Sequence, residues 1–211
     1  MQNIIFILTL TGLIATSCQG QRKSTQLISF VDTAKVFKKV IPTYDDGKLE
    51  LFYLLAKDKQ KQLGLDSMEN GVDNLQIRVW YDYSRVKERE LIIISNKATL
   101  WTATIYTLHV DWDGETERII SKEIKQATPK SGWPEFLNKL LDLQIVTLPN
   151  MHDISDYPTT GKDGRMYNVE IATKKLYRFY GYWEPQEFAN RFWQANNMRL
   201  ILELFKNELG V

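Results

Sequence analysis

The stretch that decides the fold runs from Asp163 to Trp183 and reads DGRMYNVEIATKKLYRFYGYW. Two runs rich in β-branched and aromatic residues, 166–172 and 176–183, flank the short polar segment Thr173-Lys174-Lys175. This is the pattern of a β-hairpin that follows an Asp-Gly turn. We expect the three polar residues to form the hairpin loop.

A three-residue loop gives this hairpin one apolar face and one polar face. Glu170 then lies opposite Arg178 on the polar face, and a slip of one residue would exchange the two faces. The polar face is predicted to be a recognition surface made of Asn168, Glu170, Arg178, Tyr180 and Tyr182. A solvated sheet face with one ion pair, worth about 0.2–1 kcal/mol, explains the same pattern.

Arg78 and Trp80 add to this predicted surface. In the alternating run 75–82 they project from the same face of a strand, together with Asp82. An Arg beside an exposed Trp would stack on a sugar or pair with a carboxylate. A core Trp covered by the aliphatic part of the Arg side chain is the alternative.

Composition narrows the class of protein. A length of 211 residues suits one domain, or at most two, with a real core. The net charge of +1, with Lys and Arg scattered among acids, predicts no nucleic-acid binding. Cys18 is the only cysteine, and His109 and His152 are the only histidines. These counts exclude an intramolecular disulfide, a cysteine-based metal site and a three-histidine site.

The N-terminal segment has the features of a targeting signal. Ile4 to Ala15 is apolar but too short to span a bilayer, and small residues precede Cys18. This segment resembles a bacterial lipoprotein signal, which implies removal of residues 1–17, lipidation of Cys18 and a polar tether over 18–26. The residue after the cysteine, Gln19, implies the outer membrane of the cell envelope. An ordinary cleaved signal and a buried N-terminal strand are the alternatives.

Residues 27–211 are expected to form a single α+β domain. Helices are expected over 27–41, 49–62 and 134–143, and in a long segment that begins at Pro185. Strands are expected over 75–82, 91–95, 100–110 and 117–124, followed by the two strands of the hairpin. These elements predict an antiparallel sheet of about six strands, a meander plus the C-terminal hairpin, with helices packed on one face.

Two polar clusters resemble fragments of active sites. His109, Asp111 and Asp113 alternate at a strand end, but Ile120 stands where a calcium loop needs its bidentate Glu. His152-Asp153 lies near Ser155, without the Gly-x-Ser-x-Gly motif of a nucleophile elbow. The sequence also has no P-loop, no dinucleotide-binding glycine motif and no His-Glu-x-x-His. We therefore expect no catalytic set, no metal site and no cofactor.

The six tryptophans suggest carbohydrate binding only where they are exposed. Trp112 and Trp183 lie at strand ends and are the better candidates for exposure, whereas Trp101 and Trp193 lie on apolar runs and are expected in the core.

The sequence favours a non-enzymatic binding or interaction module at the cell envelope, anchored in the membrane by lipid, with an envelope protein or a glycan as its partner. One alternative is a hydrolase, possibly directed at glycans, that uses Glu170, Asp111 or Asp113 as acid and base. Another is an immunity or inhibitor protein with one protein partner.

Overall fold

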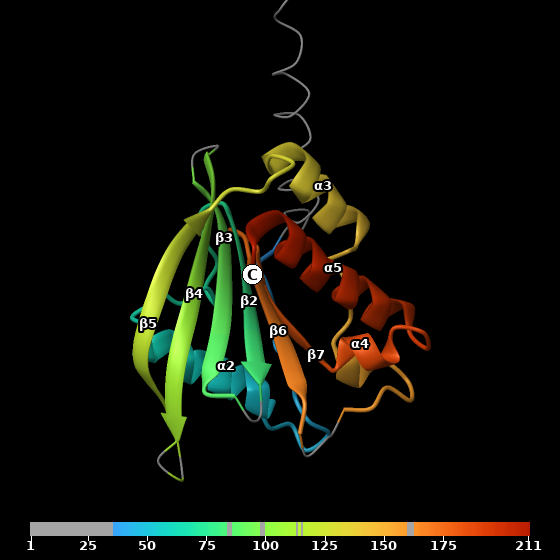
Figure 1. Cartoon of the computed structure of the whole chain (residues 1–211). Helices are drawn as coiled ribbons and strands as arrows, with labels where there is room; N and C mark the ends of the chain where they lie inside the picture. Colours follow the sequence, from blue (N-terminus) through green and yellow to red (C-terminus); the bar gives the residue numbers. More distant parts are fainter. Residues whose placement is uncertain (1–35, 84–85, 98–99, 113, 115, 160–162) are drawn as a thin grey trace, which may run out of the picture.

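The computed structural model of the protein describes residues 36–83, 86–97, 100–112, 114, 116–159 and 163–211. In this part of the chain, one seven-stranded sheet carries helices on both of its faces (Figure 1). The strands are β1 (Lys38–Val40), β2 (Leu75–Tyr83), β3 (Glu88–Lys97), β4 (Leu100–Trp112), β5 (Glu117–Ala127), β6 (Arg165–Ala172) and β7 (Leu176–Trp183). The helices are α2 (Leu51–Gln62), α3 (Trp133–Asp142), α4 (Pro185–Phe188) and α5 (Trp193–Leu209), with a 3-10 turn, η1 (Met151–Asp153).

The strand order is β1-β7-β6-β2-β3-β4-β5, and every pair is antiparallel except β1 with β7. This confirms the α+β class and a mostly antiparallel sheet that contains the predicted meander and hairpin. The seventh strand is β1, in a segment that we expected to be helical. Lys38–Val40 pairs instead with Leu176–Arg178 along the free side of β7, so sheet pairing overrides the weak local pattern.

The hairpin register differs from the prediction by one residue. Ala172 pairs with Tyr177, and the Thr173 amide donates to the Leu176 carbonyl, so only Lys174 and Lys175 form the loop. The side chain of Thr173 explains the shift. Its Oγ1 accepts from the amides of Lys175 and Leu176 at 3.2 and 3.1 Å, which makes Thr173 part of the turn's own hydrogen bonding. Because side chains alternate along a strand, the slip moves all of β7 to the opposite faces.

The prediction of helices on one face is wrong because both faces of the sheet carry a hydrophobic core. One core lies between the sheet and α3, α4 and α5, and includes Val169, Ile201 and Phe205. The other lies between the sheet and α2, and includes Tyr53 and Phe179. The central strands β2 and β6 are therefore buried on both sides, although an alternating run such as 75–82 is typical of a half-buried strand.

Candidate functional site

The seven residues of the predicted recognition surface do not form a single exposed face. Six are fully buried: Arg78, Trp80, Asn168, Glu170, Tyr180 and Tyr182; Arg178 is partly buried. The prediction of a solvated sheet face is wrong because α2 covers one side and the segment after α3 covers the other. The shifted register also separates Glu170 from Arg178, which now point to opposite faces. A binding role for these seven residues stays a prediction.

Under α2, Glu170 is the centre of a buried polar cluster. Its Oε1 accepts from Trp80 Nε1 at 2.8 Å, and its Oε2 accepts from Lys57 Nζ at 2.8 Å and from the Tyr177 hydroxyl at 3.1 Å. Arg78 lies opposite Glu170 on β2 and donates to the Asp66 carbonyl at 2.8 Å. Burial raises the pKa of Tyr177 far above its ordinary value, and the Glu170 charge adds to that effect.

On the other face, the polar groups of β7 bind the backbone that follows α3. Tyr180 donates to the Ile145 carbonyl at 2.5 Å, Tyr182 donates to the Pro149 carbonyl at 2.7 Å, and Arg178 donates to Val146 at 2.6 Å and to Leu148. These bonds satisfy carbonyls in a segment without regular structure. They also fix the position of η1, which begins at Met151 and contains His152.

A second ionic cluster lies beside the Glu170 cluster, at the end of the sheet where β2 and β4 finish and β5 begins. We call it the ion-pair quartet: Lys59 of α2, Asp82 of β2, Arg89 of β3 and Glu117 of β5. Lys59 contacts Asp82 and lies 3.5 Å from Glu117, whereas Arg89 lies 3.7 Å from Asp82 and 2.6 Å from Glu117. Each acid is thus paired with both bases. The four side chains are between 4% and 11% exposed.

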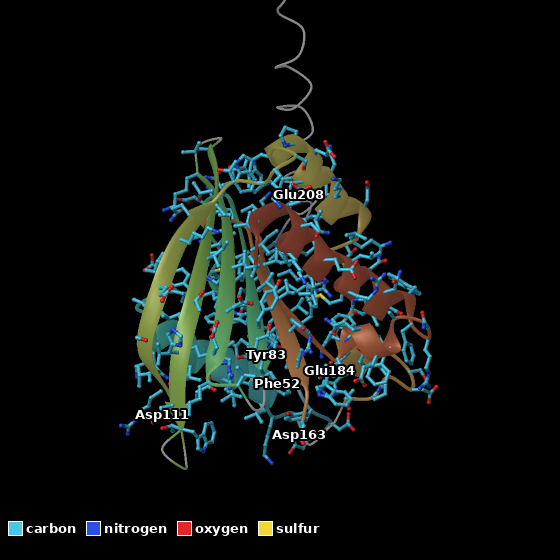
Figure 2. All side chains as sticks on the ribbon, viewed as in Figure 1. Phe52, Tyr83, Asp111, Asp163, Glu184 and Glu208 are labelled. Atoms are coloured by element: carbon cyan, nitrogen blue, oxygen red, sulfur yellow. The ribbon has the colours of Figure 1, made fainter. Side chains whose placement is uncertain are left out.

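The ion-pair quartet lies in the wall of a cleft with a volume of about 640 Å³. Figure 2 shows Phe52, Tyr83 and Asp163, which line it, at this same end of the sheet. The cleft is lined mainly by aromatic and apolar side chains around the quartet: Tyr44, Leu51, Phe52, Leu55, Tyr83, Trp112, Met166 and Trp183. Its volume falls within the range of about 300–1,000 Å³ that is typical of small-molecule sites.

The exposure of the tryptophans agrees in part with the expectation from the sequence. Trp112 is 58% exposed, which confirms the prediction that it lies at the surface, and Trp183 is half-buried. Trp101 is buried as expected, but Trp193 is 54% exposed at the start of α5, so its assignment to the core is wrong. Close packing also shapes the wall at Gly164, because a Cβ there would clash with Trp183 Nε1 and would lie 3.0 Å from Glu184 Oε1.

His152 lines the cleft and is paired with a buried acid. Its Nε2 lies 2.9 Å from Oε1 of Glu50, the residue just before α2, and its ring makes an edge contact with Tyr44. Burial raises the pKa of Glu50 above its ordinary value, although the nearby His152 acts in the opposite direction. The pair connects η1 to the start of α2, so two separate segments define this side of the cleft.

The two polar clusters that resembled fragments of active sites in the sequence are not assembled in the cleft: of their described members, only His152 lines it. Asp111 pairs with Lys87 at 2.7 Å at the exposed end of β4, Asp113 lies outside the described residues, and Ser155 bonds to Asp156. Among the residues that the structure describes, no group of three potential ligands could hold a metal ion. No described helix is both long and apolar enough to cross a membrane. Cys18 also lies outside the described residues.

Comparison of the chain with protein-family models, with curated proteins and with solved structures gives no match. The candidate site therefore rests on its own geometry.

Sequence reasoning missed the ion-pair quartet as a unit. Lys59 lies in the last turn of α2, where the helix dipole favours cations, and Glu117 begins an edge strand, where charged residues are common, so neither residue stands out in the sequence. One signal was present: Asp82 and Arg89 occur where the hairpin of β2 and β3 brings opposite charges together. The other two members come from α2 and from a strand far along the chain, which only the tertiary fold brings close.

The raised pKa of Glu50 predicts a pH dependence of stability. The folded protein binds the Glu50 proton more tightly than the unfolded chain, in which the pKa is about 4.3. The free energy of unfolding should therefore fall as the pH rises from about 4.3 through the raised pKa, and Glu50→Gln should lack this contribution. Urea unfolding at several pH values measures the difference between the two proteins. If instead the wild type gains stability relative to Glu50→Gln as the pH rises, the attraction between Glu50 and His152 outweighs the desolvation of Glu50.

Proposed function

We propose that the protein is a non-enzymatic binding module of the cell envelope that takes a small ligand or part of a partner into the cleft beside α2. The single observation that carries this proposal is the exposure of Trp112 at a cleft whose wall holds four nearly buried charges. Buried ion pairs contribute little net stability compared with apolar residues of similar volume. Their place in the wall of the cleft gives this site a fixed set of polar groups beside an exposed aromatic ring.

The attachment to the envelope rests on the N-terminal sequence. The apolar segment that ends just before Cys18 supports lipidation of that cysteine, and Gln19 after it supports an outer-membrane position. A lipid anchor would hold the domain at the membrane surface, with the cleft available to envelope components.

A hydrolase is the second candidate, because Asp82 and Glu117 both line the cleft. The two described acids among those named from the sequence do not line the cleft: Glu170 is buried under α2, and Asp111 pairs with Lys87. A glycosidase of this kind would use Asp82 and Glu117 as acid and base. The test is hydrolysis of chromogenic glycosides. If the wild type hydrolyses them and both Asp82→Asn and Glu117→Gln do not, the protein is a hydrolase and the binding proposal is wrong.

We expect Trp112→Ala to weaken ligand binding by about 30-fold, the equivalent of about 2 kcal/mol for the loss of an aromatic contact. The matched control is Trp193→Ala, which removes a tryptophan of similar exposure that does not line the cleft. Ligand-observed NMR with a library of small fragments measures both variants against the wild type. Equal loss in both variants, or hits that are indifferent to Trp112, would contradict the proposal.

The anchor predicts that the wild type partitions into the membrane fraction and that Cys18→Ser does not. The intact mass of the processed wild type should show residues 1–17 removed and acyl groups on Cys18. If both proteins are found in the soluble fraction and neither carries a lipid mass, the anchor proposal is wrong and the protein is secreted without an anchor.

A further inference from the structure

We propose that the cleft binds a short neutral saccharide. This inference rests on the proposed function, and it names the chemical class of the ligand from the charge balance and the hydrogen-bonding groups of the cleft wall.

Charge balance is the first step. The ion-pair quartet contains two cations and two anions, and every member is paired within it. A charged ligand entering here would lose hydration without meeting an uncompensated opposite charge. Of the other titratable groups in the lining, His152 is paired with Glu50, and Asp163 is exposed. The polar part of a matching ligand is therefore uncharged.

Arg89 supports the same conclusion. Its NH1 donates to the carbonyls of Val86 and Glu88, and its NH2 donates to Glu117 at 2.6 Å. A guanidinium that binds phosphate or carboxylate needs a free pair of parallel N–H donors. The planar edge of Arg89 is already used by protein groups, so anion recognition is disfavoured.

The polar part of the wall nevertheless presents donors and acceptors side by side. Lys59 is a donor, and the carboxylates of Asp82 and Glu117 retain lone pairs after they pair with the bases. A hydroxyl group both donates and accepts, so it matches such a surface without a net charge. A purely apolar ligand would cover these groups without bonding to them, which costs free energy.

Flat apolar surfaces complete the match. Trp112, Tyr83 and Trp183 line the cleft with the polar quartet, and Phe52 comes from the α2 side. Aromatic rings offer broad apolar contact at low conformational cost, and the C–H faces of sugar rings present a complementary flat surface. A ring that carries hydroxyls at its edge and C–H groups on its faces is the chemical form of a saccharide.

The test uses the full chain labelled with 5-fluorotryptophan, and the Trp112 signal in the fluorine NMR spectrum is identified with Trp112→Phe. The probes are neutral disaccharides (cellobiose, maltose, mannobiose and N,N′-diacetylchitobiose), with glucose 1-phosphate and indole as the anionic and apolar comparisons. We expect at least one disaccharide to shift the Trp112 signal saturably, with an affinity unchanged by added salt. Glu117→Gln should weaken that binding by about tenfold through the loss of an acceptor.

A second variant guards against a folding defect in Glu117→Gln. Trp112→Ala should also weaken binding, by about 30-fold when measured calorimetrically, while Trp193→Phe should leave it unchanged. If only glucose 1-phosphate or indole moves the Trp112 signal, the saccharide inference is overturned but the cleft remains a binding site. If neither these probes nor the fragment library acts at Trp112, the proposed function falls as well.

Discussion

The structure depends most on the ionic contact between α2 and the sheet. Lys57 and Lys59, two residues apart on the helix, reach the Glu170 carboxylate and the acids Asp82 and Glu117. Lys57 also lies over the rings of Tyr53 and Tyr177, at 5.5 and 5.2 Å from their centroids. Without these lysines, buried carboxylates would remain uncompensated, which is costly. The position of α2 is therefore set by charge as well as by apolar packing.

The position of α2 in turn creates the cleft. Because Lys59 contacts the sheet at the ion-pair quartet, the first turns of the helix bring Leu51, Phe52 and Leu55 to the opposite side of the same hollow. Glu50, just before the helix, then meets His152 of η1. The hydroxyls and guanidinium of β7 fix the segment that leads to η1. Two polar contacts on opposite faces of one sheet thus position both sides of the candidate site.

The sequence predicted the class of fold because its strongest signals are local. Alternation in β2, the hairpin of β6 and β7 and the apolar stripe of α3 each depend on neighbouring residues. The register of the hairpin did not follow, because the Thr173 side chain decides it through two hydrogen bonds of the turn. Nor could alternation alone show that the polar side of β2 is buried, since the covering lysines come from a separate helix.

The site was predictable only in fragments. Trp112 was identified from its position at a strand end, and Arg78, Trp80 and Asp82 were correctly placed on one face of β2. The partners that decide whether these side chains are buried or exposed, Lys57, Lys59 and Glu117, lie on elements distant in the chain. Long-range ion pairs leave no periodic pattern in a sequence, so this part of the site required the tertiary structure.

A double-mutant cycle on Lys57 and Glu170 tests the central claim most directly. Lys57→Met, Glu170→Gln and the double variant are compared with the wild type by urea unfolding, and the exposed pair Arg199–Glu203 serves as the reference. We predict a coupling energy of about 2 kcal/mol for the buried pair, against about 0.3–0.5 kcal/mol for the exposed pair. Additivity within about 0.5 kcal/mol at Lys57 and Glu170 would show that charge does not hold α2 on the sheet.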